Sequence, residues 1–127
     1  MKFYNRPFNA FIFLLACGMS HCARSLELRE LSLDEKVASS EIVMIGSVKK
    51  IIKNTQDFGY DLAITVPTTV LKGTPPKEIK FAFNASISEM HSDCCETGKS
   101  YLFFISKNTD GDYNSVNGRY GVYSLGK

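Results

Sequence analysis

Residues 41–53 read Glu-Ile-Val-Met-Ile-Gly-Ser-Val-Lys-Lys-Ile-Ile-Lys, a run rich in β-branched residues with one glycine, Gly46, in its middle. Such a run favours an extended strand, and a glycine inside a strand marks a bulge or a sharp bend. A bend allows one strand to coil around a small barrel and to pair on both of its sides. We therefore expect a small barrel whose first long strand bends at Gly46.

Downstream of this stretch, short apolar segments alternate with turn residues. Residues 60–66 alternate apolar and polar side chains, which predicts a strand with Leu62 and Ile64 on its buried face. Pro67 interrupts the run and predicts a bulge or an edge position, because proline cannot donate a ladder hydrogen bond. Turn residues separate the remaining strand-like segments, which are 78–83, 101–105, 113–116 and 120–125.

Upstream of the glycine-containing strand, Ser32 and Glu35 have the spacing of a capping box, which predicts a short helix over residues 33–39. One short N-terminal helix followed by five or six strands predicts an all-β fold, an OB-type Greek-key barrel. The length suits one domain, residues 21–127. We expect its core to contain Val48, Leu62, Ile64, Phe81, Leu102 and Phe104.

Residues 1–20 have the features of an export signal, because two basic residues precede an apolar run that is too short for a membrane span. The end of that run, Leu14-Leu15-Ala16-Cys17, resembles the bacterial lipobox, in which the cysteine is acylated and begins the mature chain. We therefore expect lipidation at Cys17 and an exported lipoprotein anchored in a membrane of the cell envelope. The alternative is an ordinary signal cut after Ser20, which would leave a soluble periplasmic or secreted protein.

The formal net charge is +2, and the leader holds two basic residues and no acidic one, so the rest of the chain is close to neutral. Nucleic-acid binding usually needs a clustered basic face, whereas the densest basic group, Lys49, Lys50 and Lys53, is typical of a solvated strand edge. We expect no nucleic-acid partner. The chain also lacks Gly-x-Ser-x-Gly, a phosphate-binding glycine loop and His-Glu-x-x-His, so we expect neither an enzyme nor a cofactor.

A resemblance to a known family depends on the order and spacing of individually weak motifs across residues 21–127. They are a cysteine after the signal, a short helix, the strand 42–48, Val70-Leu71-Lys72-Gly73, a cysteine before Gly98-Lys99-Ser100-Tyr101-Leu102-Phe103-Phe104, and a final polar hairpin. In this order they resemble the netrin-like domain of tissue inhibitors of metalloproteinases and their bacterial relatives. The resemblance implies an OB-type barrel.

The inhibitory device of that family lies at the mature N-terminus, where the α-amino and carbonyl groups of the first cysteine in a Cys-x-Cys pair chelate the protease zinc. The matching stretch here reads Ser20-His21-Cys22, so His21 and Cys22 are the candidates for an inhibitory edge, and one cysteine of the pair is missing. Cleavage directly before Cys22 would place Met19 and His21 where signal peptidases prefer small residues. We therefore expect the zinc-chelating device to be absent.

The resemblance also implies a disulfide from Cys22 to either Cys94 or Cys95. Its loop of about 70 residues would stabilise the fold by about 3–5 kcal/mol and leave one odd thiol. A bond between the adjacent Cys94 and Cys95 is not expected, because it is strained. A metal site formed by His21, Cys22, His91, Cys94 and Cys95 is the alternative, since His91-x-x-Cys94 has ligand-like spacing. Export favours oxidised sulfur, so we expect one disulfide and no metal.

Three functions remain open. The expected one is a non-catalytic, membrane-tethered module that binds an envelope or extracellular protein through barrel loops, with the odd cysteine and a hairpin over 113–123 as candidate contacts. The alternative is inhibition of a protease through an N-terminal edge at Cys22. A third is oligosaccharide or single-strand binding on the barrel face by Tyr60, Phe81 and Phe83, although the strand alternation places Phe81 and Phe83 in the core.

Overall fold

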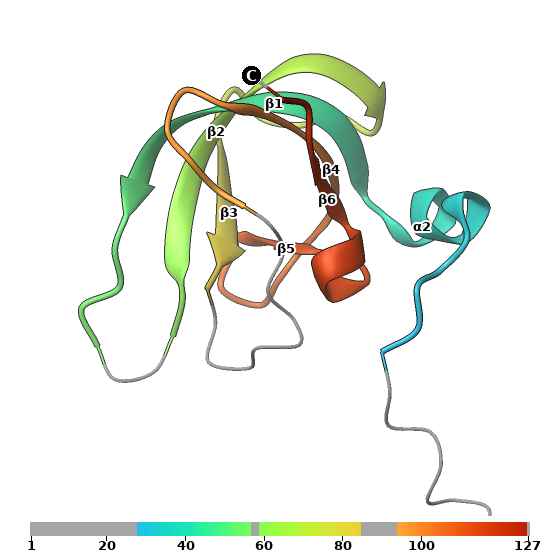
Figure 1. Cartoon of the computed structure of the whole chain (residues 1–127), viewed down its shortest axis with the longest axis horizontal. Helices are drawn as coiled ribbons and strands as arrows, with labels where there is room; N and C mark the ends of the chain where they lie inside the picture. The colour runs from blue at the N-terminus through green and yellow to red at the C-terminus, as the bar shows by residue number, and fades with distance from the viewer. Residues whose placement is uncertain (1–27, 57–58, 85–93, 127) are drawn as a thin grey trace, which may run out of the picture.

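A computed structural model describes residues 28–56, 59–84 and 94–126. Its elements, coloured along the chain in Figure 1, are α2 (Leu33–Ser39), β1 (Ile42–Ile52), β2 (Asp61–Lys72), β3 (Ile79–Phe83), β4 (Ser100–Lys107), β5 (Tyr113–Ser115), the 3-10 helix η3 (Gly118–Tyr120) and β6 (Val122–Ser124). Within these ranges no helix has the length and apolar character needed to cross a membrane.

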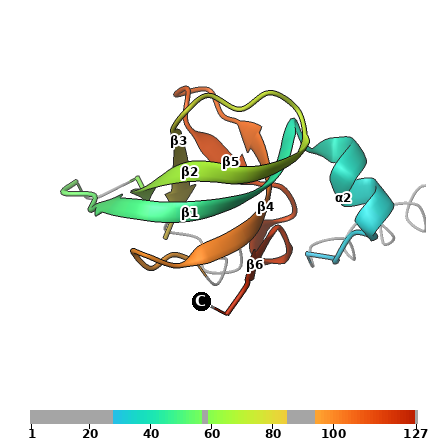
Figure 2. The same ribbon diagram turned by 90° about the horizontal axis from the view of Figure 1, so that it is seen from above.

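The strands close into a barrel. They pair in the order β1-β2-β3-β5-β4, and β4 pairs back with β1, while β6 adds a further strand beside β4. All pairs are antiparallel except β3 with β5, which meet in parallel at Phe81 and Tyr113. β1 and β2 run side by side as a long curved pair (Figure 2). The predicted all-β, OB-type barrel is confirmed.

Gly46 lies at the point where β1 pairs on both sides. It is opposite Pro67 on β2 and Tyr101 on β4, and the register with β2 shifts between Ile45 and Gly46. A Cβ atom at Gly46 would lie 2.7 Å from the Cγ2 atom of Thr65, closer than real Cβ contacts. Glycine therefore permits both the bend and the close approach of β2, as the sequence predicts.

The last two strands are segments of one interrupted strand along β4. Val116 donates its backbone N–H to the carbonyl of Phe104, and Phe104 donates its own N–H to the carbonyl of Gly121, both at 2.8 Å. Val116 and Gly121 thus both bond to Phe104, and residues 117–120 form a loop between them. The expectation of a hairpin over 113–123 is wrong, because β5 and β6 pair with β4 and not with each other.

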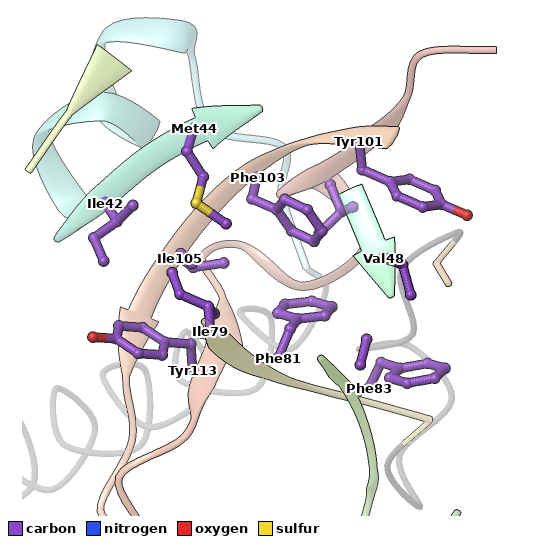
Figure 3. Packing of buried hydrophobic residues seen from close by; sticks show 12 residues of the cluster. Ile42, Met44, Val48, Ile79, Phe81, Phe83, Tyr101, Phe103, Ile105 and Tyr113 are labelled. Carbon is purple, nitrogen blue, oxygen red and sulfur yellow. The ribbon is translucent and has the colours of Figure 1, made fainter. Parts of the chain in front are cut away.

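The barrel interior is filled mainly by aromatic and β-branched side chains (Figure 3). Phe81 of β3 and Phe103 of β4 meet edge to face with ring centroids 5.1 Å apart. The buried residues that form this cluster are Ile42, Met44, Val48, Ala63, Ile79, Phe81, Phe83, Tyr101, Phe103, Ile105, Tyr113 and Val122. Val48 and Phe81 thus lie in the core as predicted.

The predicted inward faces of β2 and β4 are wrong. On β4 the inward residues are Tyr101, Phe103 and Ile105, while Leu102 is only half-buried and Phe104 is buried outside this cluster. On β2 they are Ala63 and Thr65, while Ile64 is buried as predicted but outside this cluster and Leu62 is only half-buried. A narrow barrel alternates small and large interior residues, so the space taken by Phe81 and Phe103 leaves room for only small residues on β2.

Helix α2 places the Nζ atom of Lys36 over the outward ring of Phe104, 5.8 Å from its centroid. The predicted capping box is present, since Ser32 Oγ accepts the backbone N–H of Glu35 and the Glu35 carboxylate accepts that of Ser32. Lys36 is 4% exposed and donates hydrogen bonds to Glu30, at 3.2 Å, and to the hydroxyl of Tyr123. Burial alone would lower the pKa of Lys36, but these hydrogen bonds raise it, so the lysine holds the helix against the barrel as a cation.

Candidate functional site

The candidate site is the part of β2 that extends beyond its pairing with β3. The last residue of β2 that pairs with β3 is Thr65, but β2 continues to Lys72 and pairs there with β1 alone. In the described part of the chain, residues 66–72 thus have one unpaired strand edge. Pro67 lies at the start of this edge, as the sequence predicts for a proline within a strand.

An open apolar groove runs beside this free edge. It has a volume of about 680 Å³. Val70 is 47% exposed and Leu71 is 62% exposed, so both faces of the strand reach solvent. The residues lining the groove are Val66, Pro67 and Val70 of β2 and Gly73, Thr74, Pro75, Pro76 and Lys77 of the loop that follows. An exposed edge next to apolar side chains is a typical docking place for an extended chain.

The loop that forms the far wall of the groove is held at its base. Gly73 has a φ of +86°, and a Cβ atom there would collide with the backbone carbonyl of Glu41. Lys72 donates a hydrogen bond of 2.6 Å to the carbonyl of Val37 in α2. Two prolines, Pro75 and Pro76, further restrict the backbone of this wall. The groove is therefore preformed, which lowers the entropic cost of binding.

A second cluster joins the β1–β2 and β4–β5 loops. The hydroxyl of Tyr60 lies 2.8 Å from a carboxylate oxygen of Asp110 and 3.0 Å from one of Asp112. Burial and these two hydrogen bonds raise the pKa of Tyr60 to about 12. Asn108 Oδ1 accepts the backbone N–H groups of both aspartates. The carboxylates therefore serve to tie the two loops together.

The aromatic residues considered for oligosaccharide or single-strand binding do not form an open face. Phe81 is 1% exposed and Phe83 is 7% exposed, and both belong to the core cluster. The expectation from strand alternation that they are core residues is confirmed. Tyr60 is half-buried, with its hydroxyl held by the two aspartates. These three residues therefore do not support a binding site in which bases or sugar rings stack on aromatic side chains.

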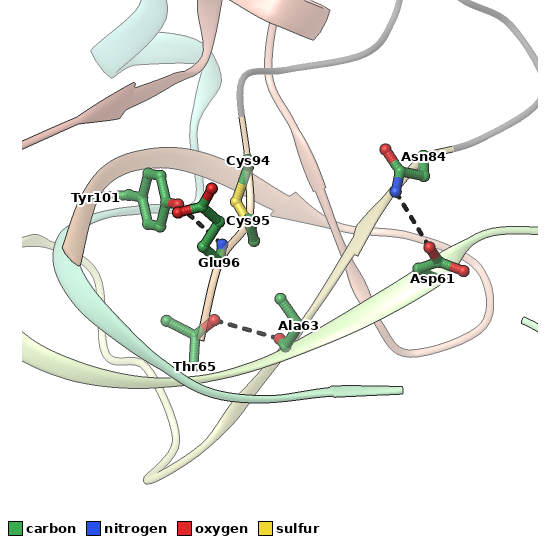
Figure 4. The surroundings of a disulfide bond; sticks show 8 residues. All are labelled: Asp61, Ala63, Thr65, Asn84, Cys94, Cys95, Glu96 and Tyr101. Carbon is green, nitrogen blue, oxygen red and sulfur yellow. Dashed lines mark hydrogen bonds between the residues drawn. A yellow bond between two sulfur atoms is a disulfide. The ribbon is translucent and has the colours of Figure 1, made fainter. Parts of the chain in front are cut away.

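The structure joins Cys94 to Cys95 in a disulfide, in the segment before β4 (Figure 4). Both cysteines are half-buried and pack against the core cluster, and the nearby Glu96 donates its backbone N–H to the hydroxyl of Tyr101. The sequence did not predict this adjacent bond, and a molecule that forms it has no sulfur left at Cys94 or Cys95 to pair with Cys22. Because Cys22 lies outside the described residues, the bridge from Cys22 stays a prediction.

The other site residues expected from the sequence, Cys17, His21, Cys22 and His91, also lie outside the described ranges. Among the residues that are described, no group of three or more His, Cys, Asp or Glu side chains converges on a place for a metal ion. The chain enters the described structure at residues 28–31, beside Asn117. The inhibitory edge and the alternative metal site therefore remain sequence expectations.

No protein-family model matches this chain, and neither does any curated protein or solved structure. The netrin-like resemblance remains an expectation that depends on the motifs quoted for it.

The groove was not anticipated from the sequence. Its signals are visible in retrospect: the apolar pair Val70-Leu71 lies beyond Pro67, and Pro75-Pro76 follows closely. What the sequence did not provide is the length mismatch between β2 and β3, which have 12 and 5 residues. Only strand pairing reveals that the second half of β2 has no neighbour on one side among the residues that the structure describes.

Proposed function

We propose that this protein is a non-catalytic binding module of the cell envelope, tethered to a membrane through a lipid on Cys17. Its proposed ligand is an extended segment of another exported protein. The observation that carries the proposal is the free edge of β2 at residues 66–72, next to an apolar groove.

The physical basis is β-strand addition. A free strand edge offers backbone N–H and C=O groups, and an extended segment can satisfy them by adding a strand. Alternate side chains of the added segment would then contact the groove wall at Pro75 and Pro76. Soluble proteins usually protect such edges with prolines, charges or covering loops. Here Pro67 protects only the start, and Val70 and Leu71 remain exposed.

Site-specific photo-crosslinking in intact cells tests this proposal. A benzophenone amino acid replaces Val70 in one variant and Leu125 in a matched control, since the two side chains are 47% and 46% exposed. We expect a discrete adduct with one other protein from position 70 and none from position 125. Equal labelling from both positions, or no adduct from position 70, would refute the assignment of the site.

A further inference from the structure

The outer face of β1, β2 and β3 continues the groove as an apolar strip. Directly paired residues on neighbouring strands project to the same face. One cross-strand row consists of Ile52, Leu62 and Ala82, and the next consists of Lys50, Ile64 and Lys80. Ile64 and Ala82 lie outside the core cluster but are only 8% and 5% exposed, so Ile52 and Leu62 form the accessible part of the strip.

The strip leads directly into the groove. Leu62, Ile64 and Val66 are two residues apart along β2 and therefore share one face, and Val66 lines the groove. Leu62 is half-buried and Ile52 is 41% exposed, so the strip reaches solvent at the end away from the groove. Because β3 occupies the edge of β2 as far as Thr65, a segment paired with residues 66–72 would have to cross onto the outer face of the sheet to contact the groove and the strip together.

Lysines flank this strip on both sides. Lys50 and Lys80 lie on the strands to either side of β2, which places their backbones about 10 Å apart. Lys77 adds a third positive charge at the wall of the groove. All three side chains are exposed and form no ion pair with the described residues, whereas Lys53 and Lys99 are paired with Asp61 and Glu96. Their charges are available to a partner.

We propose that the segment bound by this protein is acidic as well as apolar. Its apolar side chains lie on the strip and in the groove, and Asp or Glu residues on its flanks face Lys50, Lys77 and Lys80. This inference rests on the proposed function and names the chemistry of its partner. Exposed ion pairs add little affinity each, so the apolar contacts supply most of the binding, and the lysines select the partner and speed its association.

Selection from a displayed library of random dodecapeptides tests the proposal, with the purified full-chain protein as bait. We expect the enriched peptides to combine apolar residues with two or more Asp or Glu residues. Reversal of both charges in Lys50→Glu/Lys80→Glu should weaken binding of a selected peptide by about tenfold or more at low salt, because opposed charges become like charges. Added salt should reduce this difference.

Single substitutions provide matched controls. Lys80→Glu and Lys107→Glu change the net charge equally, and both lysines are exposed. Lys107 is in one cross-strand row with Tyr113 and the inward residue Phe81, so it projects to the face opposite to that of Lys80 and the strip. We expect Lys80→Glu to weaken peptide binding and Lys107→Glu to leave it within about twofold, since Lys107 projects to the other face of the sheet. Equal effects of the two variants would overturn the proposal.

Val70→Asp separates this inference from the proposed function. Selected peptides that bind in a Val70-dependent way, but without acidic enrichment, would overturn the acidic partner and leave the β2 site standing. A selection that yields no Val70-dependent peptide would overturn both. Lysine-dependent sedimentation with phosphatidylglycerol vesicles, together with no acidic peptides, would overturn the acidic segment in favour of an anionic membrane surface.

Discussion

At the residue scale, the absence of a side chain at Gly46 allows β1 and β2 to approach each other closely. We predict that Gly46→Ala destabilises the protein by about 1–3 kcal/mol, as overpacking of a core does, because the added Cβ would meet Thr65 Cγ2 at 2.7 Å. Thr65→Ser removes that methyl group and can keep the hydroxyl bond to the carbonyl of Ala63. In the Gly46→Ala background it should restore part of the loss in urea unfolding. Purely additive effects would contradict the contact.

The assignment of β4 residues to the inward or the outward face gives a second prediction at this scale. Phe103 is fully buried in the barrel, whereas the neighbouring Leu102 is half-buried on the opposite face. Phe103→Ala should lower the free energy of unfolding by about 3–5 kcal/mol, and Leu102→Ala should cost less than the 2–5 kcal/mol that is usual for a fully buried leucine. Urea titration of both variants measures the difference. A larger loss for Leu102→Ala would show that the inward face is assigned incorrectly.

At the scale of elements, the loop of residues 117–120 holds the chain where it enters the domain. Asn117 Oδ1 accepts the backbone N–H of Leu31 at 2.7 Å, and Asn117 Nδ2 donates to the carbonyl of Arg29 at 2.9 Å. Asn117 also has a φ of 67°, which glycine tolerates. Asn117→Gly should therefore release this segment and preserve the loop.

Hydrogen exchange measures that release. We expect the amide of Leu31 to exchange faster in Asn117→Gly, because its acceptor is removed, while amides in β1 and β4 keep their protection. The wild-type protein under the same conditions is the reference. Unchanged exchange at Leu31 would mean that Asn117 does not dock the entering segment.

Asp61 connects the ends of the first three strands. Its carboxylate accepts the backbone N–H of Asn54 at 2.8 Å and the side-chain N–H groups of Asn84 and Lys53 at 3.1 and 3.2 Å. The Asn54 bond, followed by those from Asn84 and Lys53, lowers the pKa of Asp61 despite its burial. A lowered folded-state pKa adds stability above the unfolded value of 3.8, and this stability is lost as the pH falls through the folded pKa.

Acid titration of stability checks this linkage. We expect Asp61→Asn to be less stable than wild type near pH 6 and to lose less stability between about pH 5 and pH 2, because it cannot be protonated. Urea midpoints across that range measure both curves. Parallel curves would exclude Asp61 as a source of the acid sensitivity.

At the scale of the whole molecule, the covalent state of the mature chain decides how the barrel is attached and cross-linked. We predict that the mature protein begins at Cys17 with acyl chains and partitions with membranes, and that Cys17→Ser is released or left unprocessed. Intact mass spectrometry of the membrane fraction measures the start site. A soluble wild-type form that begins at His21 would contradict lipidation.

The same material allows the disulfide to be mapped. Digestion without reduction distinguishes a Cys94–Cys95 bond from a bond between Cys22 and either of these residues. The adjacent bond would leave Cys22 alkylatable, whereas the long-range bond would join two peptides and leave one of Cys94 and Cys95 reactive. Free thiols at all three positions would contradict both pairings, and bound zinc in that sample would favour the metal alternative.

The elements themselves were predictable from the sequence because local interactions determine them. The capping box at Ser32 and Glu35 marks the start of α2, and the long β-branched run with Gly46 marks β1 and its bend. Pro67 indicates an edge position through its missing N–H. These features depend on side-chain shape and on backbone groups a few residues away, so no tertiary information was needed for the strand order along the chain or the barrel class.

The inward faces of β2 and β4, the loop at residues 117–120 and the groove beside β2 were decided only by tertiary structure. In β4 every residue from Tyr101 to Ile105 is apolar, so its sequence contains no preference for either face. The choice depends on which rings fill a narrow barrel and which ring lies under Lys36 of α2. Likewise, β2 has a free edge within the described ranges because its pairing with β3 ends at Thr65, a long-range relation that local sequence does not encode.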